Sequence, residues 1–258
     1  MPDRAGSPAP ASRLTTDAIA ELEVVLGPGG LHLDEAALAV YARDASHLTL
    51  GRPCAVALPA DPFALQRVVA VCARRGIPVV CRGTGTGLSG GAVPHEGDLV
   101  LSTARLNRLD DLDPDTLTLH AGAGVLNDQV TRFASYAGLH FAPDPSSQAA
   151  ASIGGNIAEN AGGPHCLRLG VTRRHLRRLD WVDASGRAWT TGRGLPLERG
   201  VDFVSLLCGS EGTLGVATGA DLALVPDPPA VVTLLAFFPE LDRATGAVVG
   251  LLGEGMLP

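Results

Sequence analysis

The sequence contains no lysine, so all 20 basic residues among its 258 are arginine. This absence excludes mechanisms that need a lysine amine, including a Schiff base, a pyridoxal phosphate site and the lysine of a nucleotide-binding P-loop. Aromatic residues make up only 4%, and the net charge is -7. Such a chain offers nucleic acid neither stacking surfaces nor a broad positive field. We therefore expect no nucleic-acid partner.

Cysteine is scarce and scattered, which limits the possible disulfide and metal sites. The sequence has no C-x-x-C pair, and its five cysteines are Cys54, Cys72, Cys81, Cys166 and Cys208. Neither a disulfide framework nor a zinc or iron–sulfur site fits this spacing, and the histidines show no ligand spacing either. We predict a reducing compartment and no metal site.

No segment has the pattern of a targeting or membrane sequence. The opening residues, MPDRAGSPAPASR, lack the apolar core of a signal peptide. The longest apolar run, residues 230–238, is far shorter than the ~20 residues of a membrane-spanning helix. We expect a cytoplasmic protein without a membrane span.

The first half of the chain predicts a small lobe, residues 51–106, in which strands and a helix alternate. The expected elements are a strand at 55–59, a helix at 62–75, a strand at 77–81 and a strand at 99–102. A helix between two strands is typical of a βαβ crossover, in which both strands run parallel.

A larger mixed lobe is predicted for residues 107–228. Its expected elements are a strand at 117–120, a helix at 125–136, a hairpin with strands at 179–183 and 187–191, and a strand at 220–225. Strand–helix alternation in one lobe and hairpins in the other predict an α+β fold.

The flanking segments complete the expected domain plan. Residues 1–14 are predicted to be a disordered tail and residues 15–50 a helical lead-in to the two-lobed domain at 51–228. Residues 229–258 carry one strand, at 231–238, and one helix, at 241–252. Because one strand and one helix cannot bury their own apolar faces, we expect them to begin a further, truncated domain.

A glycine-rich loop, RGTGTGLSGG, occupies residues 82–91 directly after a predicted strand. It matches G-x-G-x-x-G, but a Rossmann turn opens into a helix, which the following glycines and Pro94 prevent. It also matches G-x-S-x-G at Ser89, the nucleophile elbow of hydrolases, which needs the same strand–turn–helix context. Without Cβ atoms, consecutive N–H groups can converge on an anion such as a pyrophosphate, so the loop favours anion binding over a merely flexible loop.

Two further segments are rich in small residues. Residues 143–163, PDPSSQAAASIGGNIAENAGG, allow close approach of backbone to a flat ligand and supply neutral serine and asparagine groups. Residues 208–226 bracket Glu211 with glycines before a strand. Three such loops from two lobes predict a long cofactor held without a Rossmann fold.

In this order, VVCRGTGTGLSGG, PDPSSQAAASIGGNIAENAGGPHC and GSEGTLGV resemble the FAD-binding domain of the vanillyl-alcohol oxidase and p-cresol methylhydroxylase (PCMH) superfamily. The resemblance extends from about residue 38 to the C-terminus. Within the superfamily it is strongest to the FAD-linked subunits of glycolate oxidases and to D-lactate dehydrogenases. It implies a two-lobed PCMH-type domain, followed from residue 229 by the start of a substrate-binding domain.

The resemblance implies which residues bind FAD. The pyrophosphate loop would comprise Gly83, Thr84, Gly85, Thr86, Gly87, Leu88 and Ser89. The flavin and its phosphates would contact Ser146, Ser147, Ser152, Gly155, Asn156, Asn160 and Gly162. The third element would comprise Glu211, Gly212, Gly215 and Val216. Some relatives attach FAD covalently, for which His165 and Cys166 are candidates; noncovalent FAD is expected because the pyrophosphate loop has no histidine.

The implied activity is oxidation of a D-2-hydroxy acid, glycolate or D-lactate, to the 2-oxo acid. The substrate and catalytic residues of such enzymes belong to the substrate domain, so no catalytic residue is assigned here. An iron–sulfur subunit is the implied electron acceptor. Two alternatives stay open: a catalytically silent flavin-binding fragment or partner module of a split oxidase, and, more remotely, a serine hydrolase using Ser89.

Overall fold

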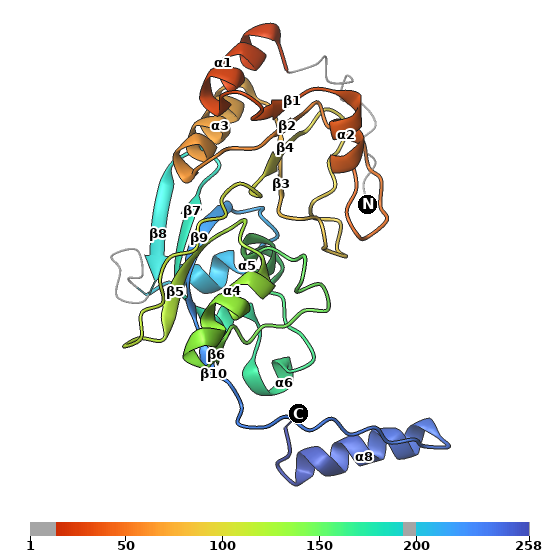
Figure 1. The fold of residues 1–258 in the computed structure, drawn as a ribbon. Coiled ribbons are helices and arrows are strands. Elements are labelled where there is room, and N and C mark those ends of the chain that lie inside the picture. Colours follow the sequence, from red (N-terminus) through yellow and green to blue (C-terminus); the bar gives the residue numbers. More distant parts are fainter. Residues whose placement is uncertain (1–13, 193–199, 258) are drawn as a thin grey trace.

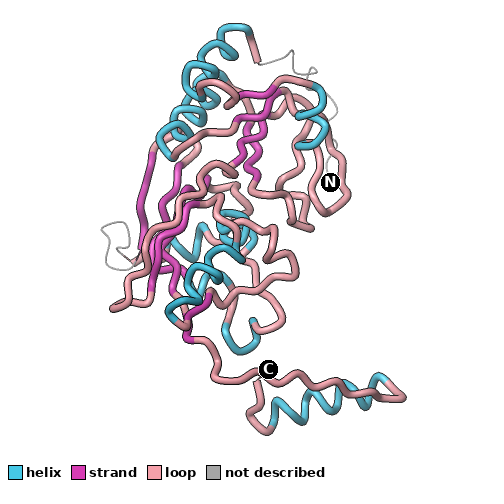
Figure 2. Tube along the Cα trace, viewed as in Figure 1, coloured by secondary structure: helices cyan, strands magenta, loops and turns pink. Residues whose placement is uncertain are grey.

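The structure is a computed structural model that describes residues 14–192 and 200–257. Two lobes, each built on a four-stranded sheet, make up most of the described chain (Figure 1). Their strands form two separate groups in Figure 2, and a C-terminal helical segment lies beyond the second lobe. The α+β, two-lobed architecture is therefore confirmed. The expected disordered tail falls on residues outside the described part, apart from Leu14.

The sheet of the first lobe has the order β1-β2-β4-β3. Its strands are β1 (Leu31–His32), β2 (Ala55–Ala57), β3 (Val79–Arg82) and β4 (Leu99–Ser102). Strand β4 lies between β2 and β3 and is parallel to both, so the predicted parallel arrangement is confirmed. Strand β1 pairs antiparallel with β2. The lead-in, predicted as helical, therefore also completes the sheet.

Three helices cover this lobe: α1 (Thr16–Leu26), α2 (Glu35–Tyr41) and α3 (Pro62–Arg75). Helix α3 has the predicted bounds because its end signals are strong. Asp61 caps it by accepting a hydrogen bond from the Ala64 N–H at 2.8 Å, and Gly76 ends it in the left-handed conformation, with φ 64. Its buried face contains Leu65 and Val68, which form part of the core of the first lobe.

The second lobe is built on an antiparallel sheet of order β5-β9-β7-β8. Its strands are β5 (Thr118–Gly122), β7 (Leu176–Val182), β8 (Ala188–Gly192) and β9 (Val216–Ala223), with a separate pair formed by β6 (Leu139–His140) and β10 (Val225–Pro226). The predicted hairpin is confirmed as β7 and β8, in which Trp181 lies opposite Trp189.

Short helices complete the second lobe: α4 (Asn127–Ala134), α5 (Ile153–Glu159), α6 (Cys166–Leu169), α7 (Phe203–Leu207) and the 3-10 turns Ser135–Ala137 and Thr172–His175. Helix α5 lies inside the small-residue segment, where the sequence predicts no helix. It forms because Ser152 caps its start, accepting a hydrogen bond from the Gly155 N–H at 3.3 Å, and because Ile153 and Ile157 are buried.

The two lobes share an apolar contact on one side of the molecule. Val182 and Val216 of the second lobe belong to the same buried cluster as helix α3. The turn of the β7–β8 hairpin also packs on this helix, since a Cβ added at Gly186 would lie 2.7 Å from the Ala70 Cβ. This contact fixes how the ends of the first-lobe strands face the second lobe.

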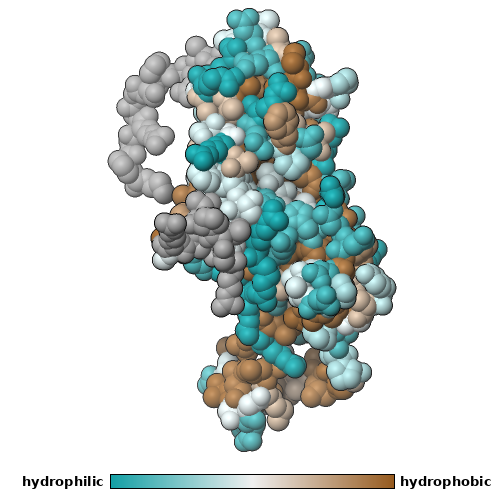
Figure 3. Space-filling model, turned by 90° about the vertical axis from the view of Figure 1, so that its left-hand side faces the viewer, coloured by the Kyte–Doolittle hydropathy of each residue, from teal (hydrophilic) through white to brown (hydrophobic). Residues whose placement is uncertain are grey.

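The C-terminal segment differs from its prediction in one respect. Helix α8 (Leu241–Gly253) is confirmed, but the strand predicted at residues 231–238 is wrong: these residues pair with no strand in the described chain. A strand needs a hydrogen-bonded neighbour, and apolar content alone does not supply one. Helix α8 buries no residue, and Leu234 is 87% exposed. Figure 3 shows apolar surface gathered at this end.

No helix within residues 14–192 and 200–257 combines the length and apolar character needed to cross a membrane.

Candidate functional site

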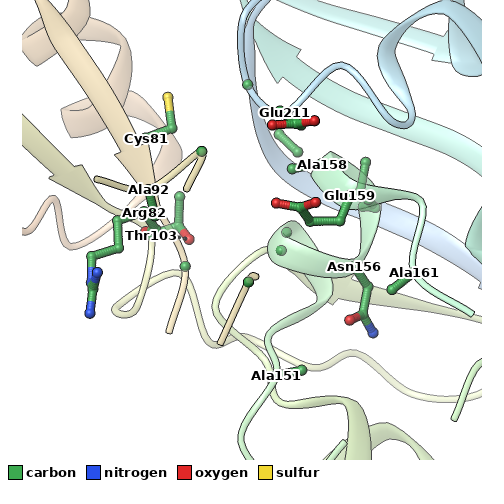
Figure 4. A pocket seen from close by; sticks show the side chains of 18 of the residues that line it. Cys81, Arg82, Ala92, Thr103, Ala151, Asn156, Ala158, Glu159, Ala161 and Glu211 are labelled. Atoms are coloured by element: carbon green, nitrogen blue, oxygen red, sulfur yellow. Dashed lines mark hydrogen bonds between the residues drawn. The ribbon is translucent and has the colours of Figure 1, made fainter. Parts of the chain in front are cut away.

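A cavity of about 300 Å³ is lined by residues of both lobes. Its wall contains parts of all three segments that the sequence indicates (Figure 4). The predicted residues that line it are Gly83, Thr84, Gly85, Thr86, Gly87, Leu88, Ser89, Ser147, Gly155, Asn156, Glu211, Gly212, Gly215 and Val216. The volume lies at the lower end of the range for small-molecule sites.

The glycine loop after β3 presents unused backbone donors. None of the N–H groups of residues 84–92 donates a hydrogen bond to any other described residue. Gly85 and Gly90 have φ angles of 76 and 80, a region that L side chains rarely adopt. A run of free N–H groups on a loop of this shape is suited to binding the oxygens of an anion.

A buried cation lies against the same loop. Arg82, the last residue of β3, is only 9% exposed, and its guanidinium donates a hydrogen bond to the Arg43 carbonyl at 2.6 Å and lies over the Tyr41 ring at 5.2 Å. Burial lowers the pKa of Arg82, while nearby Tyr41 and Asp44 oppose the shift. A Cβ on Gly85 would collide with the guanidinium, so its positive charge lies directly beside the loop backbone.

Helix α5 supplies an unpaired donor on the opposite wall. Asn156 is 2% exposed and lines the cavity. Its Nδ2 is buried and has no hydrogen-bond partner among the described residues. Because a buried unsatisfied donor is costly, a ligand acceptor at this position would stabilise the site.

The third segment brings backbone close to an aromatic side chain. Glu211 and Gly212 adopt φ angles of 54 and 75, and Gly215 lies against the Trp181 ring, where a Cβ would come within 2.6 Å. Trp181 lines the cavity and was missed by the sequence analysis. Its alternation with Leu179, which also lines the cavity, is the signal that indicates a shared strand face.

Three carboxylates line the cavity: Asp44, which the sequence did not predict, and the pair Glu159 and Glu211, of which only Glu211 was predicted. Glu159, at the end of α5, accepts a hydrogen bond from Ser89 Oγ at 2.9 Å. Glu211 lies opposite Gly91, where a Cβ would be 3.1 Å from its Oε2. In Figure 4 both glutamates lie on the wall across from Cys81 and Ala92. Glu159 follows Asn156 by three residues, so helical spacing alone would have placed it on the same face.

Four predicted residues do not line the cavity: Ser146, Ser152, Asn160 and Gly162. Ser152 caps α5, and Asn160 ends it in the left-handed conformation, with its Oδ1 accepting a hydrogen bond from the Arg173 N–H at 2.9 Å. Gly162 packs on Cys166 and Val171. Ser152, Asn160 and Gly162 thus shape the segment that carries the wall.

The candidates for covalent attachment lie elsewhere. Neither His165 nor Cys166 lines the cavity, and His165 instead pairs with Asp144. The thiol that does line it belongs to Cys81, whose pKa burial raises to about 12. No group of three histidine, cysteine or acidic side chains in the described chain could hold a metal ion.

These features define a class of protein. Free N–H groups beside a buried guanidinium suit a phosphate-bearing molecule, and the unpaired Asn156 amide and the Trp181 ring suit a polar heteroaromatic group. The loops belong to two lobes and no Rossmann helix is involved, so the site fits a loop-bound dinucleotide. A family model described as "FAD binding domain" matches residues 53–192, more than half of the chain. The chain belongs to this family, and its cofactor is FAD.

Curated proteins with similar sequences include oxidase subunits and a dehydrogenase. The chain is 40% identical over 228 residues to "Glycolate oxidase subunit GlcD" of Escherichia coli, covering 88% of this chain and 46% of the relative. It is 37% identical over 246 residues to the protein of that name from Bacillus subtilis, covering 95% and 52%. It is 38% identical over 204 residues to "D-lactate dehydrogenase" of Archaeoglobus fulgidus, covering 79% and 45%. The chain thus spans about half the length of these curated relatives.

Solved structures show the same fold at low identity. An alkyldihydroxyacetonephosphate synthase superposes with a TM-score of 0.80 at 20% identity, over 93% of this chain and 46% of that one. A p-cresol methylhydroxylase with substrate bound gives 0.72 at 20% identity, over 83% and 44%. The PCMH-type fold expected from the sequence is confirmed.

Proposed function

We propose that this chain is the FAD-binding portion of a flavin-dependent oxidoreductase that oxidises a D-2-hydroxy acid, glycolate or D-lactate, to the 2-oxo acid. The observation that carries the proposal is the similarity to glycolate oxidase subunits, which extends over 228 residues and includes every segment of the cavity wall. FAD supplies the acceptor for the hydride, and the protein supplies its binding and orientation.

In this proposal, different residues of the cavity wall bind different parts of FAD. The N–H groups of residues 84–92 donate to the pyrophosphate oxygens, and the Arg82 guanidinium beside them offsets the negative charge. Asn156 Nδ2 donates to an acceptor on the cofactor, which removes the cost of its present unpaired state. Trp181 and Val216 form an apolar wall that excludes water from the site.

We propose that the FAD is noncovalent. His165 and Cys166 lie outside the cavity wall, and the thiol of Cys81 within it has a pKa raised to about 12, so almost none of it is thiolate at neutral pH. Acid precipitation of the flavin-loaded protein should leave the yellow flavin in the supernatant. Flavin that stays with the pellet would contradict this proposal.

The substrate proposal is tested by anaerobic reduction of the bound flavin. Bleaching of the visible flavin absorbance by glycolate or D-lactate, and not by the matched control L-lactate, would support it. Flavin that binds but that no 2-hydroxy acid reduces would favour the alternative, a flavin-binding module that acts with a partner. The hydrolase alternative has less support, because Ser89 donates its hydrogen bond to Glu159 and not to a histidine.

We propose three parts for the chain after the lead-in. Residues 51–106 and 107–228 are the two lobes of an FAD-binding domain, and residues 229–258 are part of a substrate-binding domain. The exposed apolar side chains of α8 support a separate role for that last segment. An iron–sulfur partner subunit and a cytoplasmic location complete the proposal. Co-purification of an iron–sulfur protein with the native chain is the test of the partner.

A further inference from the structure

A single hydrogen bond between side chains joins the two lobes across the cavity. Ser89 Oγ, in the loop of the first lobe, donates to Glu159 Oε2, at the end of α5 in the second, at 2.9 Å. Among the described residues, no other side-chain hydrogen bond, ion pair or ring contact links residues 14–106 with residues 107–228. The apolar contact at α3 joins the lobes elsewhere, so this bond is the one side-chain hydrogen bond of the described residues that links the lobes across the cavity.

The glycine loop has few other anchors. The Gly85 carbonyl accepts a hydrogen bond from the Ala45 N–H at 3.0 Å, and the Gly90 carbonyl accepts one from the Val93 N–H at 3.1 Å. Between these two points the loop is held to the rest of the protein by Ser89. Gly87 runs beside the same carboxylate, since its Cβ would lie 3.2 Å from Glu159 Oε1. The position of residues 86–89 therefore depends on Glu159.

The charge of Glu159 excludes a role as a pyrophosphate ligand. A carboxylate repels the pyrophosphate, and Glu159 has no ion-pair partner among the described residues that would neutralise it. Its side chain also engages the Ser89 hydroxyl proton, which leaves the backbone N–H groups as the donors to the cofactor. Glu159 therefore acts on the glycine loop, which it anchors through Ser89, and not on the pyrophosphate, which it repels.

We propose that Glu159 is a positioning residue of the FAD site: through Ser89 it latches the glycine loop across the two lobes and holds the N–H groups of residues 84–92 ready for the pyrophosphate. This inference rests on FAD binding at this cavity. A preformed loop binds its ligand without first losing conformational freedom, which raises affinity.

The test compares four variants, Ser89→Ala, Glu159→Ala, Glu159→Gln and the double alanine variant, with Glu23→Ala on the exposed face of α1 as the control. FAD affinity is measured by quenching of flavin fluorescence with flavin-free protein. Each single alanine variant should weaken binding about tenfold, the effect of one charged hydrogen bond near the surface. The double variant should be no weaker, because both changes break the same bond. Glu159→Gln retains an acceptor oxygen and should bind at least as tightly as wild type.

A second measurement does not depend on the cofactor. Leu88 is 78% exposed in the loop, so chymotrypsin should cleave after it faster in flavin-free Ser89→Ala and Glu159→Ala than in wild type, with Glu159→Gln unchanged. Wild-type affinity in both alanine variants, additive losses in the double variant, or a Glu159→Gln as weak as Glu159→Ala would each overturn the latch. A wild-type chain that binds no FAD would contradict the cofactor assignment instead, and the cleavage rates would still test the latch.

Discussion

Gly83 lies so close to the Ser152 hydroxyl that a Cβ added at Gly83 would come nearer to it than the 3.0 Å that real Cβ atoms keep from their neighbours. Gly83 opens the glycine loop of the first lobe, and Ser152 caps helix α5 of the second. The start of the loop and the start of the helix are therefore in contact without room for any side chain at residue 83. Two segments that are almost seventy residues apart in the sequence thus meet at one point of the cavity wall.

The first prediction concerns this contact. Gly83→Ala should destabilise the protein by about 1–3 kcal/mol, because the new methyl group must displace Ser152 or the loop. Thermal unfolding measures the loss, and FAD affinity should fall with it. Gly246→Ala is the matched control: nothing lies within 4 Å of that position, and alanine is preferred over glycine inside a helix. Equal melting temperatures for the Gly83 variant and wild type would show that Ser152 can move aside to admit a methyl group at residue 83.

The second prediction separates two glycines of the loop. Gly85 has a φ of 76 and lies on the Arg82 guanidinium, so Gly85→Val should abolish measurable FAD binding. Gly87 has no positive φ, and its Cβ would lie 3.2 Å from Glu159 Oε1, so Gly87→Ala should weaken binding only slightly. Titration of flavin-free protein with FAD measures both. A Gly87→Ala more damaging than Gly85→Val would contradict the interpretation that the loop backbone binds the pyrophosphate.

The third prediction is a pH dependence of stability. His120 Nδ1 lies 2.7 Å from Asp221 Oδ1, and this hydrogen bond raises the pKa of His120 despite its burial. Because the folded-state pKa is above the unfolded value of about 6.5, the stabilisation is fully present below that pH and is lost as pH rises through the raised pKa.

Urea unfolding of wild type and Asp221→Asn at about pH 6 and about pH 8 tests this prediction. The stability advantage of wild type over the variant should shrink between the two pH values. His175, whose pKa is lowered mainly by burial, gives the opposite slope, but it is common to both proteins and cancels in the comparison. If the stability difference between wild type and Asp221→Asn grew with pH, the pKa of His120 would be lowered in the folded protein and not raised.

The fourth prediction concerns thiol reactivity. Burial raises the pKa of Cys54 and Cys208 to about 11 and that of Cys72 and Cys81 to about 12, whereas Cys166 is exposed. A thiol reagent at neutral pH should therefore modify one cysteine rapidly in the folded protein, and Cys166→Ser should remove that fast phase. A fast thiol that remains in the variant would show that one of the four buried or half-buried cysteines becomes accessible on the timescale of labelling.

The fifth prediction concerns the C-terminal segment. Residues 229–258 expose a large apolar surface, and none of the described ones is buried. A chain shortened to residues 1–228 should aggregate less while keeping its melting temperature and FAD affinity, because every cavity residue precedes Pro226. Light scattering and FAD titration of the two chains provide the measurement. Loss of FAD binding on shortening would assign this segment a part in the site.

The sequence predicted those elements whose signals are local. Helix α3 has its cap at Asp61, a proline at its first position and Gly76 at its end, so its bounds needed no tertiary information. Helix α5 was missed because two glycines lie within it and its stability comes from burial of Ile153 and Ile157. The strand expected at residues 231–238 was wrong because its apolar run has a suitable local pattern but no strand partner in the described chain.

The same division applies to the site. The glycine loop was predictable because free N–H groups and positive φ angles favour glycine, and the seven loop residues predicted to bind pyrophosphate, 83–89, all line the cavity. Trp181 and Arg82 were missed because each lies in a strand, where a single residue gives no sign of which cavity it faces. The contact between Glu159 and Ser89 depends on how the two lobes meet, and no pattern within either segment contains that information.

The strand order also determines when each lobe can form during synthesis. The sheet of the first lobe is complete once residue 102 has left the ribosome, whereas β5 must wait for β9, its partner about a hundred residues later. The first lobe can thus fold on the nascent chain while the second is still unpaired. Because the cavity is lined by both lobes, the complete FAD site exists only after that late strand has paired.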